Sequence, residues 1–381
     1  MRIQGIAIWS LMIIISTPLI GLDLTKINFS YKYDTQSSIK MAHRVIENES
    51  GITVFFRVSG DSLSNWKSTI LAQEEYGSTD HDTLTNVSVD TIIFNKNNGY
   101  FKLNVGSPGK SILLISIYDL NKGEYFLEAI TVKSPVGFPS IYPSSENGLP
   151  IFSSYITSDE VMIKGNQSLH AYAYLDDFQS ADPAMGAMKT ISPNIDIDSS
   201  FYFNGSVSSF EDYKFYLIQE DTLAQNALTI LKCPTYYPEF HTIEELIGPL
   251  TYITTASEIK SMTSSYNRKA FEIFWIDTYG TKFRAKNAIK RFYDEVESAN
   301  LLFTDYKQGW KTDRGMIYIV FGKPDQVRTE ERLETWIYNN GVEFEFIRIS
   351  TLFAPVMYSL KRNRKYENLW YQQVGEIRKG L

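Results

Sequence analysis

The feature that most constrains this chain is a period-two alternation of apolar and polar residues across its first third. Successive side chains of a strand point to opposite faces, so this period predicts strands with one buried face. Turn-forming Asn, Gly and Ser residues separate the runs, as in an antiparallel sandwich. We therefore expect residues 22–135 to form an immunoglobulin-like β-sandwich. The eight runs occupy residues 28–34, 39–47, 52–60, 66–76, 91–96, 100–105, 111–120 and 124–132.

A second set of strand-like runs follows a Pro- and Gly-rich stretch. Residues 136–150 are dense in Pro and Gly, which interrupt regular structure and predict a linker. Residues 175–188 predict a Met-containing loop between two of the later runs. We expect a second, smaller β-sandwich at residues 151–235. Its runs occupy residues 161–166, 168–175, 199–205, 213–219 and 226–232.

The period changes after residue 235. Thr242 with Glu245, and Thr255 with Glu258, form the Thr-x-x-Glu capping box that starts a helix. Helices are expected from about residue 239 to 300, with apolar residues at helical spacing at Ile289, Phe292, Tyr293 and Val296. Strand-like runs return after Thr304, at 316–322, 334–340 and 341–350, with a last aromatic segment at 366–374. Residues 236–381 thus predict a helical lead-in and a small α+β module, which makes the chain multidomain and mainly β.

Charge and cysteine content exclude several classes of function. The 381 residues carry a net charge of −7, so nothing in the overall charge favours nucleic acid. Cys233 is the only cysteine, which excludes an intramolecular disulfide and a multi-cysteine metal site. His81 stands between Asp80 and Asp82, but ligands adjacent in sequence rarely complete a coordination shell. We predict no metal site and no cofactor.

The N-terminus has the layout of a secretory signal peptide. Arg2 precedes an apolar run from residue 6 to 15, and Pro18 and Gly21 follow it. The run is short for a membrane span, so we expect export, removal of residues 1–21, and no transmembrane segment in the mature protein.

The densest block of the chain, DYKQGWKTDRGMIYIVFGKPD at residues 305–325, has a simple physical interpretation. Gly309 and Gly315 permit backbone angles that other residues avoid. Thr312 and Asp313 can bond nearby backbone NH groups, and Arg314 can pair with a carboxylate. These residue types predict a structured turn that leads into a strand.

The same block resembles a known family. This segment and two motifs after it resemble the GWxTD domain family. The resemblance rests on Gly309, Trp310, Thr312, Asp313, Arg314 and Gly315, on the following residues to Lys323 and Asp325, and on the downstream WIY at Trp336 and FEF at Phe344. The resemblance covers about residues 239–381 and implies an exported bacterial envelope protein, of the kind common in Bacteroidota, with β-rich N-terminal domains. It implies no established activity.

Three functions stay open from the sequence. The first is a non-catalytic interaction or assembly module whose partner is another envelope protein or a surface glycan. The second is a glycan- or peptide-binding protein that uses exposed aromatic residues such as Trp310, Tyr236 and Tyr237. The third is a hydrolase centred on Thr312, Asp313 and Arg314. A basic cluster at Lys361, Arg362, Arg364 and Lys365 predicts a solvated turn or a contact for an anionic partner.

Four short patterns resemble the Asp-Ser/Thr-aliphatic acceptor of Bacteroidota envelope O-glycosylation. The acceptor residues would be Ser62, Thr83, Thr91 and Thr222.

Overall fold

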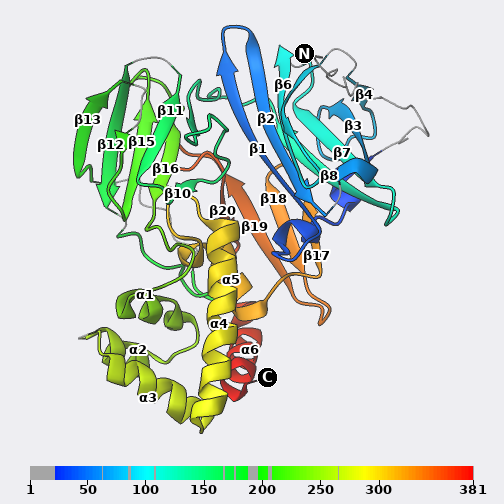
Figure 1. Ribbon diagram of the computed structural model, residues 1–381. Helices are drawn as coiled ribbons and strands as arrows, with labels where there is room; N and C mark the ends of the chain where they lie inside the picture. The colour runs from blue at the N-terminus through cyan, green and yellow to red at the C-terminus, as the bar shows by residue number, and fades with distance from the viewer. Residues whose placement is uncertain are drawn as a thin grey trace, which may run out of the picture. The chain divides into compact units, whose positions relative to one another are not determined.

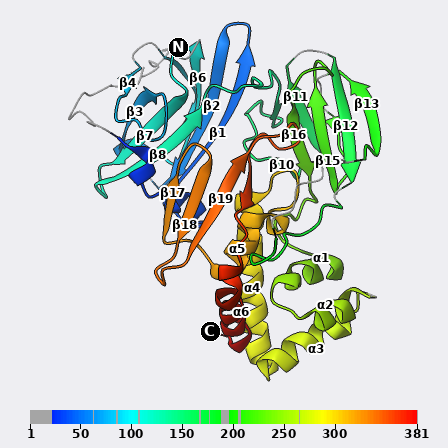
Figure 2. The ribbon, with the colours of Figure 1, turned by 180° about the vertical axis from the view of Figure 1, so that it is seen from behind.

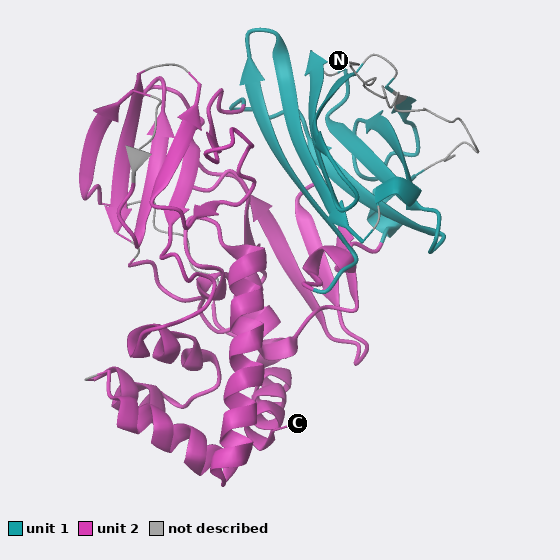
Figure 3. Cartoon of the chain, in the orientation of Figure 1, with its two compact units in different colours: residues 1–27, 36–137 teal, residues 28–35, 138–381 magenta. Residues whose placement is uncertain are grey.

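The computed structural model describes residues 22–61, 63–84, 87–106, 109–165, 168–175, 177–187, 196–204, 208–264 and 266–380. Within these residues the chain forms two compact units (Figure 3). One unit comprises residues up to 27 and residues 36–137, and the other comprises residues 28–35 and 138–381. The predicted signal peptide at 1–21 lies outside the described residues.

The first unit is a β-sandwich of two four-stranded antiparallel sheets, ordered β1-β2-β6-β5 and β4-β3-β7-β8 (Figure 1). The strand β7 is buried along almost its whole length, because its Ile and Leu side chains fill the interior. The mainly β fold with antiparallel sheets predicted from the alternation is confirmed. Its strands are β1 (Ile39–Asn48), β2 (Gly51–Gly60), β3 (Trp66–Gln73), β4 (Asp82–Thr83), β5 (Ser88–Phe94), β6 (Asn98–Gly106), β7 (Ile112–Asp119) and β8 (Glu124–Thr131).

The first predicted run, residues 28–34, is not a strand. It contains the 3-10 helix η2 (Ser30–Tyr33) and belongs to the second unit. Its aromatic side chains do not form one face of a strand. Instead, Tyr33 packs against the C-terminal part of the chain, where its ring centroid lies 5.1 Å from that of Trp336 and 5.6 Å from that of Phe303. The Tyr33 hydroxyl donates to Glu334 Oε2 at 2.7 Å.

The second sandwich combines a five-stranded sheet, β10-β16-β15-β12-β13, with a three-stranded sheet, β14-β11-β9. Pairing is antiparallel except between β10 and β16, which are parallel. The strand β9 lies inside the Pro- and Gly-rich stretch and pairs with β11. The strands are β9 (Tyr142–Ser144), β10 (Tyr155–Ile156), β11 (Glu160–Lys164), β12 (Leu169–Leu175), β13 (Ser199–Phe203), β14 (Ser208–Ser209), β15 (Lys214–Gln219) and β16 (Leu228–Lys232).

The five-stranded sheet is covered on both faces over much of its width. One face packs into the sandwich interior through residues such as Ala171 and Ile218. The opposite face presents Phe215 and Leu217 to aromatic side chains from outside the sandwich, among them Phe178, Tyr306 and Phe353. Burial of both faces joins this sheet to the C-terminal part of the chain.

The C-terminal part packs helices against an antiparallel sheet ordered β17-β18-β19-β20. Both predicted capping boxes are present, at Thr242 and Thr255. Figure 2 shows α6 alongside α4, where the Arg291 guanidinium donates to the Gly380 carbonyl. The elements are α1 (Ile243–Ile247), α2 (Ala256–Thr263), α3 (Arg268–Tyr279), α4 (Lys282–Phe303), η5 (Gly309–Lys311), α5 (Asp313–Phe321), β17 (Gln326–Thr329), β18 (Leu333–Ile337), β19 (Glu343–Ile349), β20 (Met357–Leu360) and α6 (Glu367–Lys379).

Two predicted strand-like segments are helices. The run at 316–322 lies in α5, and the segment at 366–374 begins α6. A continuous apolar run does not distinguish a buried strand from a buried helix. In α5 the residues Met316–Val320 are all buried, so the run lacks the polar stripe that would have revealed a helical period. The strand prediction is wrong for both segments, and in α5 the uniform burial is the reason.

Candidate functional site

The GWKTD block lies where the end of α4, η5 and the start of α5 meet, and two glycines set their spacing. A Cβ on Gly309 would lie 2.1 Å from the Ala299 carbonyl oxygen, and a Cβ on Gly315 would lie 1.9 Å from the Gly309 carbonyl oxygen. Neither glycine has a positive φ. The expectation that they supply unusual backbone angles is therefore wrong; they allow backbone segments to touch.

Side chains at the end of α4 hold the motif backbone. The buried Asn300 accepts from the Trp310 NH through Oδ1 at 3.0 Å and donates to the Pro238 carbonyl at 3.2 Å. The Thr304 hydroxyl donates to the Asn300 carbonyl at 2.6 Å and accepts from the Gly309 NH at 2.9 Å. These buried polar groups satisfy one another. The sequence showed an Ala-Asn pair before the motif but gave no sign of these roles.

Trp310 is buried against Tyr252. Its Nε1 donates to Gln308 Oε1 at 2.8 Å, and its carbonyl accepts from the Tyr252 hydroxyl at 2.8 Å. Tyr237 is buried as well, and its hydroxyl lies 2.5 Å from Thr304 Oγ1. Trp310 and Tyr237 therefore cannot serve as exposed aromatics of a binding surface, which corrects the choice of these two residues for the second function; Tyr236 is half-buried.

Thr312 and Asp313 are both engaged in contacts within the fold. The Thr312 hydroxyl donates to the Gly309 carbonyl at 2.7 Å and accepts from the Gly315 NH at 3.0 Å, which caps α5. The Asp313 carboxylate accepts two bonds from Arg362, at 2.6 and 3.0 Å, and one from the Leu360 NH at 2.7 Å. A bidentate pair of this kind is charge-assisted and geometrically specific. Arg362 is thus a largely buried partner of Asp313, not a member of a solvated basic turn.

Arg314 is enclosed by aromatic rings. Its guanidinium carbon lies 3.9 Å from the centroid of Tyr358 and 5.1 Å from that of Phe303. It also donates to the Tyr33 hydroxyl at 3.2 Å and lies 3.6 Å from Glu334 Oε1. Cation–π contacts and the carboxylate together compensate its charge in a desolvated position.

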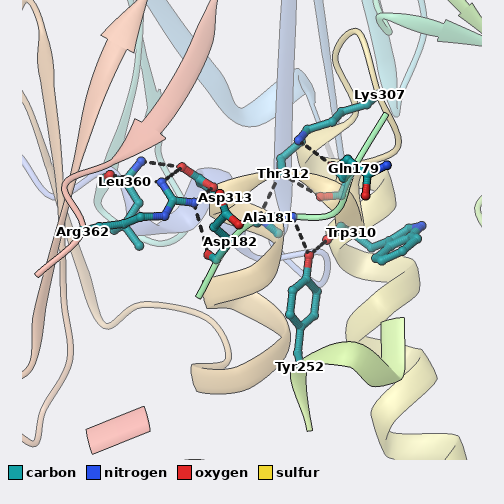
Figure 4. Close-up of polar contacts among 12 residues, drawn as sticks. Gln179, Ala181, Asp182, Tyr252, Lys307, Trp310, Thr312, Asp313, Leu360 and Arg362 are labelled. Carbon is teal, nitrogen blue, oxygen red and sulfur yellow. Dashed lines mark hydrogen bonds and ion pairs between the residues drawn. The ribbon is translucent and has the colours of Figure 1, made fainter. Parts of the chain in front are cut away.

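A strap, which we define as residues 177–187, crosses the motif (Figure 4). The Ala181 NH donates to the Tyr252 hydroxyl at 3.2 Å, and Lys307 Nζ donates to the Gln179 carbonyl at 3.1 Å. The Arg362 guanidinium donates to the Asp182 carbonyl at 3.2 Å, so one arginine contacts both Asp313 and the strap. Within the predicted loop, residues 177–187 are thus bonded to side chains that surround the motif.

Of the other predicted site residues, Trp336 shares the Glu334 carboxylate with Arg314, whereas Lys323 and Asp325 bond residues outside the GWKTD segment. Trp336 is fully buried and donates through Nε1 to Glu334 Oε1 at 2.9 Å. Lys323 pairs with Asp34 at 2.7 Å. Asp325 accepts from the backbone and side chain of Asn339, both at 2.7 Å.

The predicted glycosylation positions stay predictions. Thr91 and Thr222 are exposed, and the backbone of Thr83 lies in β4. Ser62 lies outside the described residues.

Burial also perturbs ionisation beside the motif. Burial raises the pKa of Asp305 to about 6, against the opposing influence of nearby Lys307. Burial lowers the pKa of Lys307. Both groups lie in the short segment between α4 and η5.

Across the described ranges no group of three or more His, Cys, Asp or Glu is arranged to hold a metal ion. Among those same residues, no helix combines the length and the apolar character that crossing a membrane requires.

Gly315→Ala should destabilise the protein, because its Cβ would overlap the Gly309 carbonyl oxygen. We expect a loss of about 2 kcal/mol or more in urea unfolding. Gly375→Ala is the matched control, since Gly375 is also helical and a Cβ there meets nothing within 4 Å. That control should gain about 0.5–1 kcal/mol from helix propensity. Equal effects at the two positions would contradict the close-contact role.

Asp313→Asn should cost about 3 kcal/mol or more, because it leaves the Arg362 charge largely buried without its partner. Arg362→Met in the same background should cost much less than it does alone. A double-mutant cycle in urea measures this coupling. Additive losses would show that the two side chains do not depend on each other.

The raised pKa of Asp305 predicts a pH dependence of stability. The folded state favours the protonated acid, so the stability present below about pH 4 is lost as the pH rises through about 6. The loss should be on the order of 2 kcal/mol. Asp305→Asn keeps a neutral side chain and should remove this loss. Parallel stability-versus-pH curves for wild type and variant would contradict it.

Part of the chain matches a known protein family. The GWxTD domain family matches residues 214–379, a range that begins at β15 and includes the motif. The crystal structure of DIP-gamma IG1+IG2 is similar over 52% of this chain and 99% of its own, with 11% identity and a TM-score of 0.18. That TM-score supports no statement about how the sandwiches are arranged. No curated protein matches the chain. The resemblance to the GWxTD domain family is thus confirmed over residues 214–379.

Proposed function

We propose that this chain is an exported cell-envelope protein that acts without catalysis, as an interaction or assembly module for another envelope protein. The observation that carries the proposal is the strand β5. It forms one edge of its sheet and pairs, among the described residues, with β6 alone. Three consecutive apolar side chains at its end are exposed: Ile92 by 42%, Ile93 by 37% and Phe94 by 50%.

An apolar edge strand suits a protein partner. Its outer row of backbone NH and C=O groups can pair with an added strand, and its side chains can enter pockets on that partner. Edge strands are commonly protected by charged residues or Pro. A β-bulge between Thr91 and Ile93 twists this strand, yet its apolar end stays exposed.

The contacts of the motif favour the same function. A hydrolase centred on Thr312, Asp313 and Arg314 would need these groups to reach a substrate. The Thr312 hydroxyl caps a helix, the Asp313 carboxylate holds Arg362, and the Arg314 guanidinium lies on aromatic rings. The motif therefore supports a rigid module, and export rests on the signal-like N-terminus together with the family resemblance.

Crosslinking and affinity capture from the native envelope would test the proposal. Ile93→Lys places a charge in the exposed edge and should abolish capture of at least one specific protein. Leu223→Lys is the matched control, because Leu223 is an exposed leucine on a different unit. Capture should be unchanged for that control, with equal melting temperatures for all three proteins.

Two results would overturn the proposal separately. An identical set of captured proteins for wild type and Ile93→Lys would remove β5 as the interaction surface. Absence of the wild-type protein from the envelope fraction would remove the export.

A further inference from the structure

We infer that the exposed edge of the second sandwich carries a saccharide-binding platform, formed by Tyr202 stacked on His170, whose ring in turn contacts Tyr172. This inference is independent of the protein-binding role proposed for β5. The platform lies on β13, the edge strand of the five-stranded sheet (Figure 1).

The three rings form one contiguous stack on a single face of the sheet, in which His170 lies between the two tyrosines and is tilted by 38° against Tyr172. His170 and Tyr202 stand directly opposite each other on paired strands. Their ring centroids are 4.2 Å apart and the planes differ by 18°. The His170 ring also lies 4.3 Å from that of Tyr172, which follows two residues later on β12. Tyr202 is thus the outermost ring.

One face of the Tyr202 ring is open. Stacking on His170 covers the other face, yet Tyr202 is 73% exposed. Tyr172 packs at its inner side against the buried aromatic cluster around Phe215 and Phe353. The stack therefore extends from the buried aromatic cluster to the edge of the sheet. Its last ring, Tyr202, is supported on one face by His170.

The size and charge of the platform favour a sugar. A protein partner needs roughly 800 Å² on each side, far more than a single exposed ring at a sheet edge provides. The exposed groups of the platform, Tyr202 and the neighbouring Ser200, carry no charge, so a neutral ligand fits. Ser200 lies two residues before Tyr202 on the same face of β13 and is exposed, which places a hydroxyl beside the ring.

A β-linked glucose chain matches this chemistry best. Its ring hydroxyls are equatorial, so each flat face of the sugar presents axial C–H groups. These carry slight positive charge and pack against the negative face of an aromatic ring. Hydroxyls at the sugar edge can bond Ser200.

Titration of the full chain with cellohexaose tests the inference, by calorimetry and by saturation-transfer NMR. We expect a Kd of about 0.1–1 mM for wild type, with transfer strongest at the axial C–H protons. Tyr202→Ala should weaken binding by about 10-fold or more, and Tyr202→Phe, which keeps the ring, should bind like wild type. Tyr371→Ala is the matched control, since Tyr371 is a tyrosine exposed by 63% outside the stack. It should bind like wild type.

Three outcomes would overturn the inference, given equal melting temperatures for all variants. The first is the absence of saturation transfer from the wild-type protein to cellohexaose at 10 mM, about ten times the weakest expected Kd. The second is equal binding by wild type and Tyr202→Ala. The third is a change of oligomeric mass in Tyr202→Ala, which would make the platform a contact between protein copies.

Discussion

The close contact among the backbones of Ala299, Gly309 and Gly315 is the constraint on which the C-terminal fold depends. Only hydrogen atoms fit in the space where side chains at the two glycines would stand. This contact allows the Thr312 hydroxyl to bridge the Gly309 carbonyl and the Gly315 NH, and so to start α5. A larger residue at either glycine would separate η5 from α4 and remove the geometry of that bridge.

Distant parts of the sequence are attached to this centre. Tyr33, far from the motif in sequence, bonds Glu334 and receives a hydrogen bond from Arg314. The strap bonds Tyr252 and Arg362 through its backbone. Long-range contacts of this kind link the second sandwich and the N-terminal segment to the GWxTD domain, so one cooperative unit can result. The polar side chains of the motif are therefore engaged in contacts that hold the fold together.

Buried polar chemistry accounts for the residue types of the signature. Asp313 and Arg362 exchange two charge-assisted bonds where little water reaches them. Arg314 balances its charge with Glu334 and with aromatic faces. Partial replacement of such a network leaves a buried charge without a partner, which costs more than any single contact contributes. This asymmetry gives a physical reason for Asp and Arg at these positions that requires no substrate.

The sequence by itself determined the elements whose signals are local. The alternation around β1, β2, β7 and β8 predicted strands, and Thr242 and Thr255 marked helix starts, because period and capping act over a few residues. Tertiary structure decided the rest. The run at 316–320 became a helix because neighbours bury it on every side, and residues 28–34 became an anchor because Tyr33 fits among Trp336 and Phe303. Three further features depend on residues that are distant in sequence: the burial of Trp310, the carboxylate that pairs with Arg362 and the ring on which Tyr202 stacks. A short-range sequence pattern does not encode such contacts.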